Sequence, residues 1–106
     1  SIAEHQAKAD AAFARYHKTL LNAVEEVQIA LYALNYQKER MEIRTDLCHT
    51  AANSLNRHQL LYEQAFSDYI AMSKAEDSLH TQEIELLEAK MGYALDFVTL
   101  SKALGG

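Results

Sequence analysis

Proline is absent from this chain, and its only glycines stand at positions 92, 105 and 106. Proline and glycine are the residues that most often interrupt regular structure, so nothing before residue 92 carries the usual signal for a loop. The sequence therefore predicts a few long, uninterrupted elements and excludes a fold built from many short ones.

Apolar side chains recur between Phe13 and Tyr62 at steps of three, four or seven residues. This spacing is typical of an amphipathic helix with a heptad-like seam, and its members are Phe13, Tyr16, Leu20, Val24, Val27, Leu31, Leu34, Met41, Cys48, Leu55 and Tyr62. A helix of about 60 residues would be roughly 90 Å long at about 1.5 Å per residue, which is too long for a compact globular domain. A helix of this length needs another helix beside it.

A second run of helical spacing follows a candidate reversal at 65–67. Ser67 or Asp68 can cap the new helix by accepting a hydrogen bond from a free backbone N–H, and Gly105 and Gly106 would end it. The run consists of Ile70, Met72, Leu79, Ile84, Leu86, Leu87, Met91, Leu95, Val98 and Leu104. The prediction is an all-α, coiled-coil-like, long antiparallel hairpin over 1–106: a helix at about 2–64, a tip at about 65–67 and a helix at about 68–104. Polar residues between 45 and 56 lower helix propensity and leave a break there as an alternative.

The two expected helices are unequal, so residues 1 to about 27 have no partner within the chain. Phe13, Tyr16, Leu20 and Val24 lie in this part. Contiguous exposed apolar side chains usually mark an interaction surface. The sequence therefore predicts a homo-oligomer, or a parent protein that supplies further helices.

Composition and motifs argue against several other functions. The net charge of −5 does not suit nucleic acid, and no apolar run approaches the roughly 20 residues that a membrane-spanning helix needs. Histidines do not pair at i, i+4, and the single cysteine excludes a cysteine cage, so no metal and no cofactor are predicted. Neither a nucleophile elbow nor a glycine-rich phosphate loop is present, which disfavours an enzyme.

Three segments together resemble the TolC and OprM outer-membrane factor family. Ala12–Tyr16, Thr19–Val27 and Ala30–Leu31 are similar to the long helix of that family's second repeat, and Tyr62–Ile70 is similar to its tyrosine-x-x-glycine tip. Leu100–Gly106 resembles the lysine-alanine-leucine-glycine-glycine ending of the last tunnel helix. The segments occur in the family's order and cover nearly the whole chain.

This resemblance implies a passive conduit rather than a catalyst. The hairpin would be a segment of an α-barrel tunnel in the periplasmic part of an outer-membrane efflux or type I secretion channel, connected to an inner-membrane pump through a periplasmic adaptor protein. The outer-membrane barrel and the first repeat are missing, so the resemblance favours a fragment of a trimer-forming parent over a hexamer of single hairpins.

The resemblance also implies roles for particular residues. The adaptor-docking tip would consist of Tyr62, Ala65, Phe66, Ser67, Asp68 and Tyr69, and the pore constriction of Ile70, Ser73 and Lys74. Two departures stand out. Ala65 replaces the family's tip glycine, which would make any positive-φ conformation more costly, and Lys74 reverses the charge that relatives often carry at the constriction.

Three other classes remain open at this point. One is a coiled-coil interaction module that binds partner helices without a pore. Another is a periplasmic adaptor hairpin, against which the ending Lys102–Gly106 argues. The last is a di-iron bundle, for which Asp77 and His80 supply only one of the two acid-x-x-His elements that such a site requires.

Overall fold

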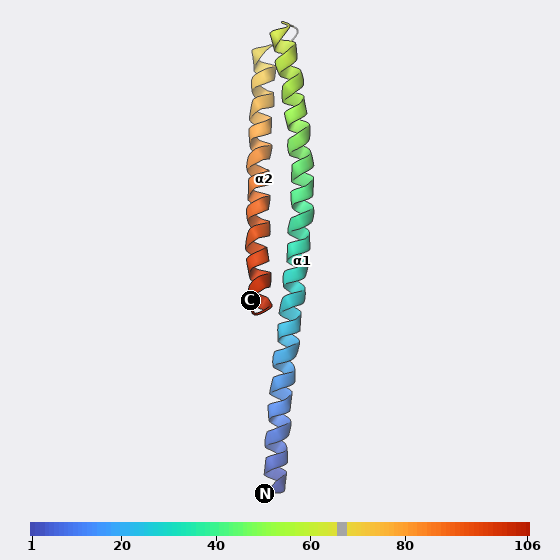
Figure 1. Ribbon diagram of the computed structural model, residues 1–106, viewed down its shortest axis with the longest axis vertical. Coiled ribbons are helices and arrows are strands. Elements are labelled where there is room, and N and C mark those ends of the chain that lie inside the picture. Colours follow the sequence, from blue (N-terminus) through green and yellow to red (C-terminus); the bar gives the residue numbers. More distant parts are fainter. Residues whose placement is uncertain (66–67) are drawn as a thin grey trace.

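The computed structural model describes residues 1–65 and 68–106, and these form two helices that run antiparallel (Figure 1). Helix α1 spans Ile2–Glu63 and helix α2 spans Tyr69–Ala103. The molecule measures 96 × 19 × 14 Å, and the described ranges contain no strand. The prediction of an all-α, extended helical hairpin is confirmed. Helix α1 continues through 45–56 without a break.

Side chains and glycines at the helix ends explain where each helix begins and stops. Ser1 and Glu4 form a capping box at the start of α1, and the Asp68 carboxylate accepts a hydrogen bond of 2.7 Å from the Ala71 N–H at the start of α2. Helix α2 ends in a Schellman motif, in which Gly106 N–H donates to Ser101 O and Gly105 has a φ of 83°. The C-terminal glycines therefore terminate the helix as the sequence indicates.

A seam of alternating large and small or polar residues joins the two helices. On α1, five larger residues recur every seven positions and alternate with a second heptad series: Val27, Leu34, Met41, Cys48 and Leu55 with Ala30, Gln37, Arg44, Ala51 and His58. On α2 the two series are Met72, Leu79, Leu86, Tyr93 and Leu100 with Ala75, Gln82, Ala89, Asp96 and Ala103. Every one of these side chains is buried or half-buried. This is the a/d pattern of a coiled coil.

Two contacts fix how the seam residues face each other. Arg44 and Glu85 form an ion pair of 2.5 Å, and the Gln37 amide lies where a Cβ on Gly92 would fall. Residues whose numbers add up to about 129 therefore lie opposite one another, as expected for antiparallel helices with the same rise per residue. Large residues then face small ones. Met41 falls opposite Ala89, which is completely buried.

The Arg44–Glu85 pair is the one ion pair between helices in the described part of the chain. Its side chains are 32% and 36% exposed, so water screens the attraction and the pair contributes little net stability. An arginine inside an apolar seam nevertheless needs an acceptor, and Glu85 supplies it. The pair therefore favours one register of α1 against α2 over shifted ones.

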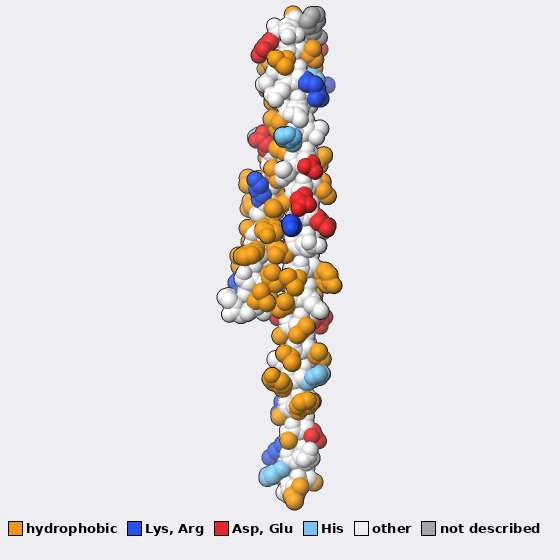
Figure 2. Space-filling model, turned by 45° about the vertical axis from the view of Figure 1, so that its right-hand side comes forward, with side chains coloured by type: hydrophobic (Ala, Val, Ile, Leu, Met, Phe, Trp, Pro, Cys, Tyr) orange, Lys and Arg blue, Asp and Glu red, His pale blue; other side chains and the backbone are white. Residues whose placement is uncertain are grey.

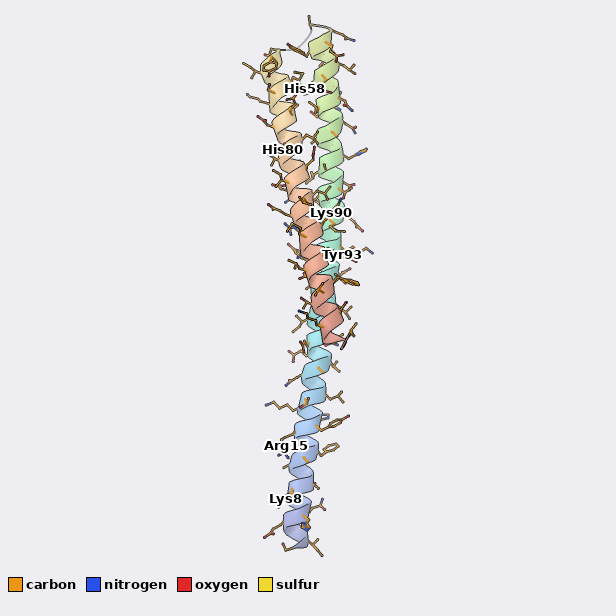
Figure 3. All side chains as sticks on the ribbon, turned by 60° about the vertical axis from the view of Figure 1, so that its left-hand side comes forward. Lys8, Arg15, His58, His80, Lys90 and Tyr93 are labelled. Carbon is orange, nitrogen blue, oxygen red and sulfur yellow. The ribbon has the colours of Figure 1, made fainter. Side chains whose placement is uncertain are left out.

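Ser1 and the part of α1 up to residue 26 lie at or beyond the C-terminal end of α2, and we call residues 1–26 the overhang. Every residue of the overhang is exposed, and its labelled side chains Lys8 and Arg15 stand on a single helix (Figure 3). Phe13 and Tyr16 are 70% and 67% exposed and continue the a/d spacing of the buried seam. The overhang thus presents an unfilled continuation of the seam.

Candidate functional site

The hairpin reverses at the end farthest from the overhang (Figure 1). Gln64 closes α1 with its N–H directed to Leu60 O, and Ala65 N–H donates to Tyr62 O at 3.0 Å. Tyr62 and Tyr69 then meet across the turn, edge to face, with ring centroids 6.0 Å apart. Such aromatic pairs contribute about 0.5–1.5 kcal/mol beyond the area that they bury. The pair holds the first turn of α2 against the last turn of α1.

Most of the predicted tip residues are brought together on this exposed end. Tyr62 is 43% and Tyr69 62% exposed, and Ala65 and Asp68 are also exposed. Phe66 and Ser67 lie outside the described residues. Among the described residues, this end presents the rings of Tyr62 and Tyr69 and the carboxylate of Asp68, a composition that suits contact with another protein.

Ala65 adopts a φ of 63°, in the left-handed region where a Cβ is unfavourable. The cost expected from an alanine in place of the family's glycine is thus present in the structure. We expect Ala65→Gly to raise the free energy of unfolding by about 0.5–1 kcal/mol, since the relief of strain exceeds the greater entropy of glycine in the unfolded chain. Urea unfolding followed by circular dichroism measures this change.

Ala94→Gly is the matched control, because Ala94 is exposed within α2. The same substitution in a helix interior should lower stability by about 1 kcal/mol. A loss of stability for Ala65→Gly as large as that of the control would contradict the strain at the tip.

The three predicted constriction residues differ in their surroundings. Ile70 is 64% exposed, Lys74 is exposed, and Ser73 is half-buried. Lys74 lies eleven residues before Glu85, about three helical turns, so the two charged side chains share one face of α2. Ser73 is about 100° away from Lys74 around the same helix. At i, i+3 and i+4 the three side chains share one broad face of α2 and differ in how far they are exposed.

The ranges that the structure describes contain no evident metal-binding site. They hold no group of three or more histidine, cysteine, aspartate or glutamate side chains that could bind an ion. His58 is a seam residue whose Nδ1 donates to Ser54 O at 2.8 Å, and His17 stacks on Phe13 at 6.2 Å. These two histidines thus take part in packing rather than in a cluster of ligands.

Sequence reasoning did not separate the apolar side chains of the seam from those that point away from it. Figure 2 shows hydrophobic side chains gathered along the rod as well as on the overhang. They include Ile29, Tyr36 and Ile43 on α1 and Leu87 and Met91 on α2, all more than half exposed. A search for a second heptad series beside the seam would have found them.

These features define a class: a long, two-helix structural segment with apolar surface beyond what its own hairpin covers. The sequence model of the outer membrane efflux protein family matches residues 1–106. The chain belongs to the outer membrane efflux protein family, a family of transport channels, and the resemblance seen in the sequence is confirmed. No curated protein and no solved structure matches the chain significantly.

No helix within 1–65 or 68–106 is both long and apolar enough to cross a membrane.

Proposed function

We propose that this chain is a wall segment of the periplasmic tunnel of a trimeric outer-membrane efflux or type I secretion channel. The observation that carries the proposal is the rod itself: a 96 Å hairpin from an efflux family with apolar side chains exposed along both helices. These exposed side chains would contribute to stability once neighbouring helices cover them, because burial of apolar surface is favourable. Side-by-side packing of several hairpins around a passage would cover them.

In this proposal the chain helps to enclose a passage for exported substrates and has no catalytic role. Substrates pass through the enclosed water, and an inner-membrane pump supplies the driving force from the far side of the adaptor. Neither a cofactor nor a nucleic acid takes part, and the membrane is reached only through the barrel of the full-length parent.

The tip residues would dock to the periplasmic adaptor protein. Tyr62 and Tyr69 offer amphipathic rings at the free end of the rod, and Asp68 adds a charge beside them. Tyrosine is enriched at the energetic centres of protein interfaces because one end is apolar and the other forms hydrogen bonds. Phe66 and Ser67 belong to the same proposed surface.

The constriction would lie just behind the tip. Lys74 is exposed on the same face of α2 as Glu85, and Ile70 is exposed one turn before Lys74. A lysine in a narrow passage would repel cations, so this channel would favour anions at the gate. Ser73 would brace the constriction from its half-buried position.

Site-specific cross-linking in the full-length parent tests the docking claim. Cysteines at 65, 68 and 69, introduced one at a time with Cys48→Ala, should form cross-links to the adaptor. A cysteine at exposed position 49, about four turns from the tip, should form none. The absence of a cross-link from every tip position would remove the docking surface.

The same experiment separates the runner-up, a coiled-coil interaction module without a pore. Such a module would bind partners along its apolar faces, so its cross-links would arise along the rod and not selectively at the tip.

A further inference from the structure

Charge is divided unequally between the two broad faces of the hairpin, which lie on either side of the seam. Contacts between side chains show which residues share the first of these faces. Arg44 of α1 pairs with Glu85 of α2. Arg40 Nη1 donates to Gln37 Oε1 at 3.4 Å, and the Gln37 amide lies beside Gly92 of α2. These five residues therefore mark one side of the seam on both helices.

The heptad repeat extends this face along α1. Residues seven positions apart occupy the same side of a helix in a coiled coil. Tyr36 lines a groove together with Arg40 and Arg44, so the row that contains Tyr36 lies on the same side of the seam as they do. The basic members of that row are Lys8, Arg15 and Arg57.

Helix α2 continues the same face. Glu88 lies one turn after Glu85, and the row of Glu88 includes Lys74 and Lys102. We call this side of the hairpin the basic face, and its charged members are Lys8, Arg15, Arg40, Arg44, Arg57, Lys74 and Lys102 with Glu26, Glu85 and Glu88. Seven basic against three acidic residues give the basic face a net charge of +4, although the whole chain carries −5.

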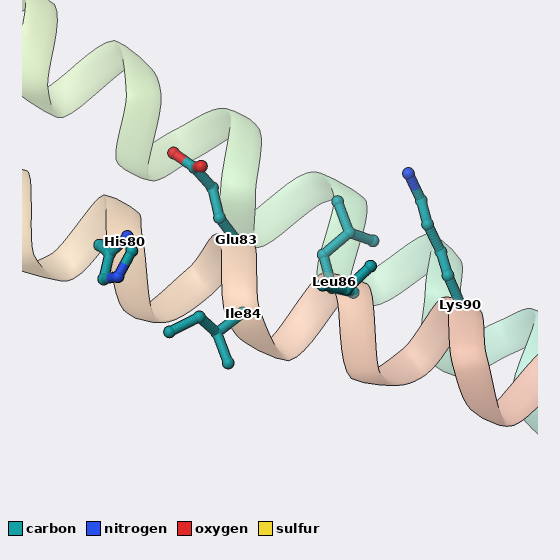
Figure 4. Close-up of a pocket in the computed structure, with 6 residues that line it drawn as sticks. His80, Glu83, Ile84, Leu86 and Lys90 are labelled. Carbon is teal, nitrogen blue, oxygen red and sulfur yellow. The ribbon is translucent and has the colours of Figure 1, made fainter.

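The opposite face has the reverse balance. Lys38 and Tyr93 line a groove there, and Lys90 lies one turn before Tyr93. Glu83 and Lys90 extend to the same side of α2, whereas Ile84 extends away from α1 (Figure 4). The charged members of this face are Asp10, Lys38, Glu42, Glu63, Glu76, Glu83 and Lys90, and all are exposed. Two basic against five acidic residues give it a net charge of −3.

We propose that the basic face lines the passage of the channel and makes the passage selective for anions. Lys74, the basic residue of the proposed constriction, belongs to this face, so the wall behind the constriction would carry the same sign of charge. The row from Lys8 to Arg57 is roughly 74 Å long at about 1.5 Å per residue, which is most of the 96 Å rod. A lining follows the whole rod in this way, whereas a docking site for one partner occupies a patch.

The basic face would act through the field that it creates. A cleft of one sign of charge between low-dielectric walls raises the local concentration of counter-ions, and rings of arginine or lysine select anions in pores. In a trimer each basic position recurs three times around the axis, which strengthens the field. Solutes that carry carboxylate, phosphate or sulfate groups would therefore be the preferred cargo. This inference rests on the proposed function and adds the class of substrate.

Recordings of the full-length parent in planar lipid bilayers test the assignment, under a gradient of KCl at low ionic strength, where screening is weak. Arg57→Glu and Lys102→Glu should each lower the ratio of chloride to potassium permeability by about two-fold or more. Lys38→Glu and Lys90→Glu are the matched controls, because they make the same change of charge at exposed positions of the opposite face. They should leave the ratio unchanged.

Cysteine modification gives a second readout that does not depend on a buried or reversed charge during folding. In a Cys48→Ala background, Arg57→Cys treated with a positively charged methanethiosulfonate should regain the preference for chloride. A negatively charged methanethiosulfonate should lower the preference further. Neither reagent should change the permeability ratio of Lys90→Cys.

Each outcome decides the assignment. Shifts confined to positions 57 and 102 support it. Shifts confined to positions 38 and 90 would place the basic face on the outside of the tunnel, where an anionic polymer could cover it, and would overturn the inference, as would equal shifts from both faces or none from either. In these cases a conducting parent leaves the proposed tunnel standing. A parent that passes no current would overturn the tunnel and this inference with it.

Discussion

Ala89→Asp should unfold the hairpin under conditions in which the native chain is folded. Ala89 is completely buried in the seam and falls opposite Met41, so a larger side chain has no room there. Overpacking together with the desolvation of a carboxylate should lower the free energy of unfolding by about 3 kcal/mol or more. A hairpin with so small a core has little stability to spare. Far-UV circular dichroism during urea titration measures the loss.

Ala94→Asp provides the comparison. Ala94 lies five residues further along α2 and is exposed, so the same substitution should change stability by about 0.5 kcal/mol or less. Equal losses for the two variants would show that Ala89 does not lie in a close helix contact.

Tyr69→Glu in the full-length parent should weaken binding of the adaptor protein by about 30-fold, and export should fall with it. Tyr69 is 62% exposed at the proposed docking end, and loss of a central aromatic anchor costs about 2 kcal/mol or more. Titration of the adaptor by surface plasmon resonance measures the affinity, and survival on an exported toxic compound measures transport.

Two variants separate docking from folding. Tyr69→Phe keeps the ring that meets Tyr62, so it should retain most of the affinity. His49→Glu adds the same charge to an exposed position about three turns from Tyr69 along the rod and should leave binding unchanged. An unaltered affinity for Tyr69→Glu would exclude this side chain from the docking surface.

Most of the fold was predictable because local signals agreed with each other. The absence of proline and the heptad spacing of Val27, Leu34, Met41, Cys48 and Leu55 indicated a long helix, and each of these residues lies in the seam. Gly105 and Gly106 indicated the end of α2, which the Schellman motif confirms. The unequal length of the helices also followed from where the cap and the glycines stand.

The orientation of individual side chains was less predictable. Val24 and Leu31 belong to the apolar spacing of the first helix, yet both remain exposed, whereas Gln37 and Arg44 occupy the seam. Hydrophobicity alone cannot identify a seam position that is polar, because its partner, Glu85 in the case of Arg44, is 41 residues away in the chain. The seven-residue repeat identifies the polar seam positions Gln37 and Arg44 only once it is known how α1 is aligned against α2.

For the tip and the constriction, the location was predictable from the sequence but the role was not. The resemblance to the efflux family indicated where the chain reverses and that Ala65 would carry a cost, and the φ of 63° agrees with both. Their roles depend on an adaptor and on neighbouring hairpins, and a single chain carries no information about how those molecules approach. Lys74 is exposed and Ser73 is half-buried, a difference that no motif indicated.

The central claim is that this hairpin stands in the wall of a continuous passage, and an electron cryomicroscopy map of the full-length parent tests it most directly. The account predicts that residues 1–106 form one of several parallel-standing hairpins around an open, water-filled channel, with the Tyr62–Tyr69 turn at its free end. A map in which this hairpin fills the centre of a solid bundle, or lies outside a wall made by other helices, would contradict it.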